Sequence, residues 1–240
     1  MLHHKAWIPG LLLFPNPNNK TGSYYLLYQF NGVYLPSILV PDGVFMIKEF
    51  NTYIEAIPLD FWRDLCRDEG NLKKVARGET FLSIGEVCKY LGYIESGSFK
   101  YVAFTEDGDE KIVGLETVGG FVANWPYCLQ KLPSKVAIIA NTDSEISSMP
   151  VSKIIKMMQH DINFERLVSN PTKEMFYTIY NRIIDLYIKS PQERYEDLLK
   201  KCPRIFEIFD LKDVASFLNI TPIYLSRIRK KLKEEENENL

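Results

Sequence analysis

Hydrophobic positions near the C-terminus recur with the period of a half-buried helix. Leu211, Val214, Ala215 and Leu218 fall at i, i+3, i+4 and i+7, which predicts one helix with a single apolar face. Asn219 follows, and asparagine tolerates the left-handed conformation that often ends a helix. The pattern therefore predicts a short helix that stops at a tight turn.

A second helix is predicted directly after this turn. Thr221 is suited to cap it and Pro222 to occupy its first position, while Leu225, Ile228 and Leu232 can pack on the first helix. Two helices around a tight turn are typical of a helix-turn-helix, in which the second helix enters the major groove of DNA. The candidate DNA-binding residues are Thr221, Pro222, Ile223, Tyr224, Ser226, Arg227, Lys230 and Lys231.

The alternative is an ordinary helical hairpin, because cations near a helix C-terminus are favourable for dipole reasons alone. The distribution of charge argues for DNA. The whole chain carries −2, yet lysine and arginine outnumber aspartate and glutamate between residues 172 and 233. The acidic tail EEENENL follows, and we expect it to be unstructured.

Short β-prone runs separated by glycine-containing turns fill residues 72–150. This spacing predicts an antiparallel barrel or jelly roll, with hairpin turns at Ser96-Gly97 and Asp107-Gly108. Ahead of it, residues 57–70 predict an amphipathic helix whose apolar side holds Phe61, Trp62 and Leu65.

Helical patterns return after Pro150. Residues 151–159 predict a short helix, and a second, starting at Phe164, is expected to break near Pro171. Residues 173–189 then predict a long helix with an apolar stripe of two heptads. This stripe either packs on the β region or pairs with a second copy of the chain. The candidate dimerisation residues are Phe176, Ile179, Tyr180, Ile183, Leu186 and Tyr187.

Residues 1–45 differ from the rest in having few charges and many aromatics. Asn31-Gly32 between two β-prone runs predicts a hairpin. The segment is either a genuine extra hairpin or sequence translated ahead of a natural start at Met46, and the change in charge density there favours the second reading. Residues 7–14 are too short for a membrane span, and no signal cleavage site follows.

The cysteine and histidine residues do not predict an enzyme active site. Cys66, Cys88, Cys128 and Cys202 are far apart, which predicts reduced thiols in a cytoplasmic protein and no metal site. There are three histidines, and the chain lacks a phosphate loop and a convincing nucleophile–base pair. We therefore expect no catalytic residues, no metal and no cofactor.

The order of β-barrel, long helix and helix-turn-helix resembles the bacterial Crp/Fnr superfamily of transcription regulators. The resemblance spans about residues 55–233 and rests on RGETFLSIGEVCKYLGYIESGSFKYV and on SPQERYEDLLKK with DLKDVASFLNITPIYLSRIRKKL. It implies an α+β homodimer with a cyclic-nucleotide-binding-like β-roll, a dimerisation helix and a reader of palindromic promoter sites. On this match Thr221, Pro222, Ser226 and Arg227 fall at positions that contact phosphate or base edges.

The resemblance also implies the domain organisation. An atypical extension occupies residues 1–45, the jelly-roll-like β-roll sensor 46–160, the central dimerisation helix 161–190 and the helix-turn-helix domain with its acidic tail 191–240. Few residues follow the recognition helix, so the β wing that is usual in the family is expected to be reduced or absent.

One departure from the family concerns the ligand. Members that bind cyclic nucleotides hold the phosphate with a Glu and an Arg, whereas here Asn124 and Ser134 stand near those positions. Lys135 offers a point charge without the guanidinium fork, so cyclic AMP is not the expected effector. The pocket either takes another molecule or is filled and silent. Its candidate residues are Phe121, Asn124, Trp125, Tyr127, Ser134 and Lys135.

These patterns together predict a sequence-specific DNA-binding regulator that acts as a homodimer. Its partners would be double-stranded DNA with an inverted repeat and a second copy of the chain. RNA polymerase and a small-molecule effector are further candidates, and no membrane is expected. The competing hypothesis is a ligand-sensing β-roll whose helical tail contacts proteins and not DNA.

Overall fold

The chain divides into two units, residues 1–46 and 47–240, and the computed structural model describes residues 11–15, 24–30, 33–37, 58–69 and 71–238. In the first unit, β1 (Leu11–Pro15), β2 (Tyr24–Phe30) and β3 (Val33–Ser37) form an antiparallel sheet in that order. Asn31-Gly32 lies outside the described residues, but Phe30 pairs with Val33, as the predicted hairpin requires. That residues 1–45 precede a natural start stays a hypothesis.

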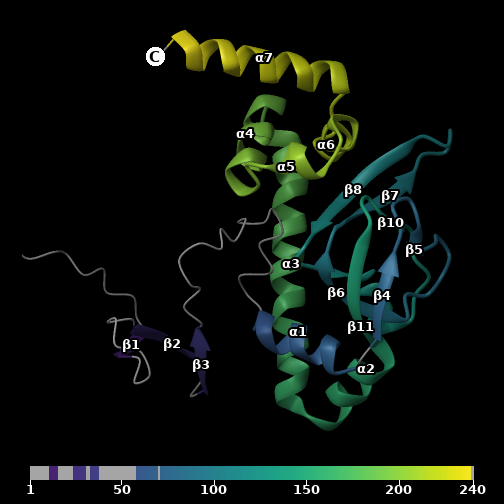
Figure 1. Cartoon of the computed structure of the whole chain (residues 1–240), viewed down its shortest axis with the longest axis vertical. Helices are drawn as coiled ribbons and strands as arrows, with labels where there is room; N and C mark the ends of the chain where they lie inside the picture. Colours follow the sequence, from purple (N-terminus) through teal and green to yellow (C-terminus); the bar gives the residue numbers. More distant parts are fainter. Residues whose placement is uncertain (1–10, 16–23, 31–32, 38–57, 70, 239–240) are drawn as a thin grey trace, which may run out of the picture. The chain divides into compact units, whose positions relative to one another are not determined.

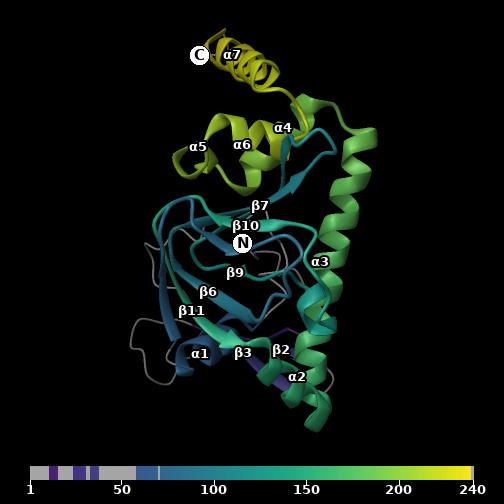
Figure 2. The same cartoon turned by 90° about the vertical axis from the view of Figure 1, so that its right-hand side faces the viewer.

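Two four-stranded antiparallel sheets build the β-roll of the second unit (Figures 1 and 2). The first sheet has the order β5 (Thr80–Leu82), β10 (Ala137–Ala140), β7 (Ser98–Phe104) and β8 (Glu110–Thr117). The second has the order β4 (Asn71–Val75), β11 (Ser144–Pro150), β6 (Tyr90–Ser96) and β9 (Phe121–Val122). The predicted fold class, a β-roll followed by helices, is confirmed.

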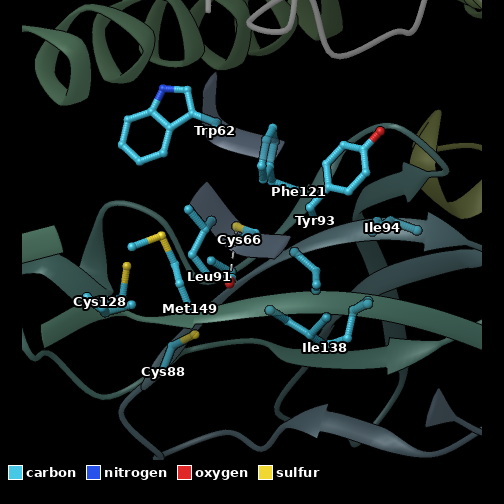
Figure 3. Packing of buried hydrophobic residues seen from close by; sticks show 14 of the residues in the cluster. Trp62, Cys66, Cys88, Leu91, Tyr93, Ile94, Phe121, Cys128, Ile138 and Met149 are labelled. Carbon is cyan, nitrogen blue, oxygen red and sulfur yellow. Dashed lines mark hydrogen bonds between the residues drawn. The ribbon is translucent and has the colours of Figure 1, made fainter. Parts of the chain in front are cut away.

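Alternation along the strands decides which side chains fill the roll. Phe99 and Ile138 from the first sheet meet Ile94, Val122 and Ile146 from the second in one buried cluster. Figure 3 shows part of this cluster, including the thiol of Cys66, which donates a hydrogen bond to the carbonyl oxygen of Leu91. The opposite face of the first sheet is also apolar, because the C-terminal helices cover it.

Of the two hairpins predicted within the β-roll, one is confirmed. β7 and β8 pair antiparallel around the turn at Asp107-Gly108, with Phe104 opposite Glu110. The hairpin predicted at Ser96-Gly97 is wrong, because β6 and β7 belong to different sheets and the chain crosses between them there. Gly97 has φ +89°, and a Cβ there would meet the backbone and side chain of residues 143 and 144, so the crossing requires glycine.

Three helices frame one side of the roll. α1 (Leu59–Asp68) buries Trp62 and Cys66, whereas Phe61, predicted to be on its apolar side, is exposed. α2 (Val151–His160) leads into α3 (Ile162–Ile188), which runs along the roll in both views (Figures 1 and 2). The predicted break near Pro171 is wrong, since α3 continues through this residue.

Packing explains why α3 tolerates the proline. Pro171 removes one backbone hydrogen bond, at a cost of about 3 kcal/mol in a free helix. Val168 and Phe164, one and two turns earlier, are buried against the roll and hold the helix in place.

The C-terminal region is helical throughout its described length. α4 (Pro191–Lys201) begins with a capping box formed by Ser190 and Glu193. α5 (Ile205–Ile208), α6 (Leu211–Phe217) and α7 (Pro222–Glu238) follow, and α7 lies at the opposite end of the unit from α1 and α2 (Figure 1). The expectation of an unstructured acidic tail is wrong for residues 234–238, which extend α7. α7 ends at the last described residue, so the expectation of a reduced or absent wing lies outside the described residues.

Candidate DNA-binding and effector sites

The turn between α6 and α7 is built from backbone hydrogen bonds around Asn219. Asn219 adopts φ +55°, and its amide donates to the carbonyl oxygen of Ser216 at 2.9 Å. The amide of Ile220 donates a second hydrogen bond to the carbonyl oxygen of Ala215, at 3.0 Å. These two bonds form a Schellman motif, which ends α6 and fixes the direction in which the chain leaves it.

α7 starts at the predicted residue and has its predicted cap. The Thr221 hydroxyl accepts a 3.2 Å hydrogen bond from the amide of Tyr224, and Pro222 is the first helical residue. Leu225 and Ile228 are buried in one cluster with Val214, Ala215 and Leu218 of the preceding segment. The crossing of the two helices thus confirms the apolar pattern that predicted it.

The other face of α7 is open. The exposed residues on and just before it include all the candidate DNA-binding positions: Thr221, Pro222, Ile223, Tyr224, Ser226, Arg227, Lys230 and Lys231. Lys230 and Lys231 form exposed ion pairs with Glu234 and Glu235. Arg227 makes no hydrogen bond or ion pair to any residue in the described part of the chain. Arg229 instead stacks on Phe206, 4.0 Å from its ring centre, and so serves packing.

α6 docks on the outer face of the β-roll, which the sequence did not predict. The Ser216 hydroxyl accepts a hydrogen bond from the amide of Ile112 in β8 at 2.9 Å. Lys100 in β7 pairs with the buried Asp213 at 3.1 Å. Ile112 and Val102 share an apolar cluster with the residues of α6. The position of the helix-turn-helix is therefore set by β7 and β8.

Arg182 of α3 joins three elements. Its guanidinium donates to the carbonyl oxygens of Val113 in β8 and Phe217 in α6, each at 2.8 Å, and stacks on the Phe217 ring. Val113 is an extra residue in β8, because Tyr101 pairs with Gly114 while Val102 pairs with Ile112. Burial lowers the pKa of Arg182 to about 10, so the side chain stays charged near neutral pH.

The apolar stripe of α3 is largely uncovered. Phe176 is 61% exposed and Tyr187 is 86% exposed, and Ile179, Tyr180 and Ile183 are also exposed. Leu186 is half-buried. The rings of Phe176 and Tyr180 stack in parallel, 5.9 Å apart. The β-roll therefore covers the N-terminal part of α3, while most of the predicted stripe stays exposed.

A cavity of about 230 Å³ lies between the β-roll and α3. Of the candidate pocket residues, Phe121, Asn124 and Trp125 line it. Tyr127, Ser134 and Lys135 do not: Tyr127 begins the short 3-10 helix Tyr127–Gln130, the Ser134 hydroxyl donates to the carbonyl oxygen of Val136, and Lys135 is exposed. The structure thus brings together half of the predicted set.

Other lining residues were missed because they are distant in sequence. α1 contributes Trp62, β7 contributes Tyr101, and β8 contributes residues 113–116, ending in the buried Glu116. α3 contributes Pro171, Met175, Thr178 and Ile179. Gly120 packs directly against Glu116, because a Cβ at this position would meet the carboxyl group at under 3.0 Å.

The four thiols are buried and none of them forms a disulfide. No group of three or more His, Cys, Asp or Glu residues is placed to hold a metal ion in the part of the chain that the structure describes. Burial raises the pKa of Cys66 and of Cys128 to about 12. No described helix is both long enough and apolar enough to cross a membrane.

Comparison with known proteins identifies the β-roll first. Residues 72–161 match the family model of the cyclic nucleotide-binding domain. No curated protein matches the sequence.

Solved structures share the fold of most of the second unit. FixK2 from Bradyrhizobium japonicum superposes with a TM-score of 0.62 at 16% identity, over 69% of this chain and 85% of that one. The c-di-GMP-responsive global regulator CLP from Xanthomonas campestris superposes with a TM-score of 0.54 at 14% identity, over 69% of this chain and 87% of that one. A CRP/FNR-family transcriptional regulator from Thermus thermophilus superposes with a TM-score of 0.52 at 15% identity, over 69% of this chain and 87% of that one. The resemblance to the Crp/Fnr superfamily is thereby confirmed for the fold.

Proposed function

We propose that the protein is a sequence-specific DNA-binding transcription regulator that acts as a homodimer. The observation that carries this proposal is the capped helix-turn-helix whose second helix leaves Arg227 exposed, with no hydrogen bond or ion pair to the residues described. An arginine held in this way has both terminal nitrogens available for a guanine edge, a contact worth about 1–3 kcal/mol of discrimination.

The neighbouring residues would complete a major-groove contact. Thr221 and the first amides of α7 would hold a phosphate, as helix N-termini do. Ser226 and Tyr224 would meet neighbouring bases or phosphates, and Ile223 would touch a thymine methyl. Lys230 and Lys231 would exchange their exposed glutamate partners for phosphates, which contributes salt-dependent affinity.

A second copy of the chain is the proposed partner of α3. The exposed stripe of large apolar side chains is unusual for a monomer in water. Its burial against the same stripe of another copy would create a two-fold dimer with two copies of α7. Such a dimer reads an inverted repeat whose half-sites are about one helical turn apart. RNA polymerase at the promoter is a further partner in this proposal.

A ligand in the cavity would reach the reading helix through β8. Residues 113–116 line the cavity, while the backbone of Ile112 and Val113 bonds to Ser216 and Arg182. A molecule that fits one position of β8 better than another would therefore shift the position of α6. Phe121, Asn124 and Trp125 are proposed as part of this effector site, and Glu116 joins them.

The experiment compares the retention of sheared genomic DNA by the wild-type protein and by Arg227→Ala. We expect the variant to lose sequence-specific retention. Arg204→Ala is the matched control, since it removes the same charge from an exposed pair with Glu207 outside α7. Equal retention by all three proteins would favour the competing hypothesis, in which the helical region contacts proteins.

A further inference from the structure

The cavity beside α3 is a site whose ligand class its own side chains define. Four aromatic residues wall it: Trp62, Tyr101, Phe121 and Trp125. Trp62 and Phe121 are both labelled in Figure 3, at the edge of the buried cluster. Aromatic faces of this kind favour a flat ring, and they also attract a cation placed over them.

Two of these aromatic side chains are held by hydrogen bonds. The Tyr101 hydroxyl donates to the carbonyl oxygen of Ala123 and accepts from its amide, both at 3.3 Å. The indole nitrogen of Trp125 donates to the Thr172 hydroxyl of α3 at 2.8 Å. Because these contacts exist before a ligand arrives, little ordering remains to oppose binding.

The described lining of the cavity contains one acidic side chain and no basic one. Glu116 is the one carboxylic acid among the described residues that line it, and none of these residues is lysine, arginine or histidine. Lys135 is exposed and does not reach the cavity. An anionic ligand would therefore be removed from water without a cation to compensate it. A ligand that donates hydrogen bonds or carries positive charge would find an acceptor in Glu116 and aromatic faces around it.

The size of the cavity limits the ligand further. A cavity of about 150 Å³ accommodates benzene, and drug-sized ligands occupy about 300–1,000 Å³. A volume of about 230 Å³ falls between these and suits one or two fused rings with a short side chain.

We infer that this cavity binds a small aromatic amine and excludes phosphate- and carboxylate-bearing molecules, cyclic nucleotides included. This inference rests on the proposed function, because the ligand is taken as the effector of the regulator. The amino group would lie against Glu116 on β8, and the ring between Trp125 and the side chains of Met175 and Thr178 on α3. The ligand would thus bridge the strand and the helix that both contact the DNA-binding region.

The test is a calorimetric titration with four probes in the absence of DNA. The probes are tryptamine, neutral indole, indole-3-acetate and cyclic AMP. We expect tryptamine to bind at least tenfold more tightly than indole, and the two anions not to bind. Tighter binding of either anion, or no binding of tryptamine, would overturn the inference.

Two variants separate the ligand from general damage to the fold. Glu116→Gln keeps the shape of the side chain. We therefore expect it to lower the affinity for tryptamine to that for indole and to leave the affinity for indole unchanged. Met175→Trp places bulk in the cavity from a half-buried position on α3, so we expect it to abolish binding of both. Circular dichroism verifies that both variants fold. An unchanged preference for tryptamine in Glu116→Gln would overturn the role of the carboxyl group.

The outcome also separates this inference from the proposed function. Recovery of a DNA operator by a protein that binds neither tryptamine nor indole would overturn the inference alone. Binding of tryptamine by a protein that retains no DNA would support the cavity assignment and contradict the regulator.

Discussion

Arg182 on the long helix donates a 2.8 Å hydrogen bond to the carbonyl oxygen of Phe217, and its guanidinium carbon lies 3.6 Å from the centre of the Phe217 ring. The same guanidinium donates to Val113 of β8, which lines the cavity. One side chain therefore connects the proposed dimer helix, the proposed effector cavity and the first helix of the helix-turn-helix.

Replacement of Arg182 by methionine should loosen this connection. The variant leaves the carbonyl oxygens of Val113 and Phe217 without their donor, and we expect the free energy of unfolding to fall by about 2 kcal/mol. Denaturant titration measures this change. Arg166→Met, on an exposed face of the same helix, is the control. Its free energy of unfolding should fall by less than about 0.5 kcal/mol. Equal stability of the two variants would show that the contact is dispensable.

Lys100 and Asp213 form the other polar link between the roll and α6. Lys100→Met leaves a buried carboxylate uncompensated, and we expect a loss of about 3–5 kcal/mol in the free energy of unfolding. Lys74→Met removes an exposed pair with Glu145 and should cost about 0–1 kcal/mol. The double variant Lys100→Met with Asp213→Leu should recover most of the loss. If the double variant does not recover the lost free energy of unfolding, packing and not charge holds α6 on the roll.

The exposed stripe of α3 predicts the association state. Tyr180→Glu places a charge in the stripe beside Phe176, so we expect sedimentation to show a dimer for the wild-type protein and a monomer for the variant. Val118→Glu adds the same charge at an exposed apolar position outside α3 and should stay dimeric. A monomeric wild-type protein would contradict the proposed dimer.

The buried thiols predict both reactivity and a pH dependence. At pH 8 we expect Cys66 and Cys128 to react with a disulfide reagent only after unfolding, because burial raises both pKa values to about 12. Well below pH 9, these thiols are protonated in the folded and the unfolded protein alike. Between pH 9 and 12 only the unfolded chain loses the protons, so the free energy of unfolding should fall as the pH rises.

Denaturant titrations across this pH range measure the effect. Cys66→Ala should be less stable at neutral pH but should show a shallower decline above pH 9. Rapid reaction of either thiol in the folded protein at pH 8 would contradict the burial that the structure shows.

Local patterns were sufficient for the elements whose partners lie nearby in sequence. Asn219, Thr221 and Pro222 specify the turn and the start of α7 through backbone chemistry alone, and Val214 and Leu225 show the periodicity of packed helices. The same logic found the hairpin at Asp107-Gly108.

Features that depend on distant partners could not be read in this way. β11 contains Ser144, Ser147 and Ser148, which are buried although their composition is typical of a loop. The hydroxyl of Ser148 donates to the carbonyl oxygen of Asn71 in the neighbouring strand. Pro171 appeared to end a helix that tertiary packing carries through.

The cavity shows the same limit. Phe121 and Asn124 were found because they lie in the segment where the family holds its ligand. Glu116 and Met175 come from a strand and a helix that meet only in the folded chain. No spacing within the sequence connects them, so the chemistry of the site emerged only from the structure.

Selection of bound fragments from sheared genomic DNA, at two salt concentrations, tests the central claim most directly. The account predicts that the wild-type protein recovers fragments sharing one inverted repeat, with half-sites about one helical turn apart. Affinity should fall steeply with salt, by a slope of about 0.9 for each phosphate contacted. Fragments without a common repeat, or no retained DNA at either salt concentration, would contradict a dimeric sequence-specific regulator.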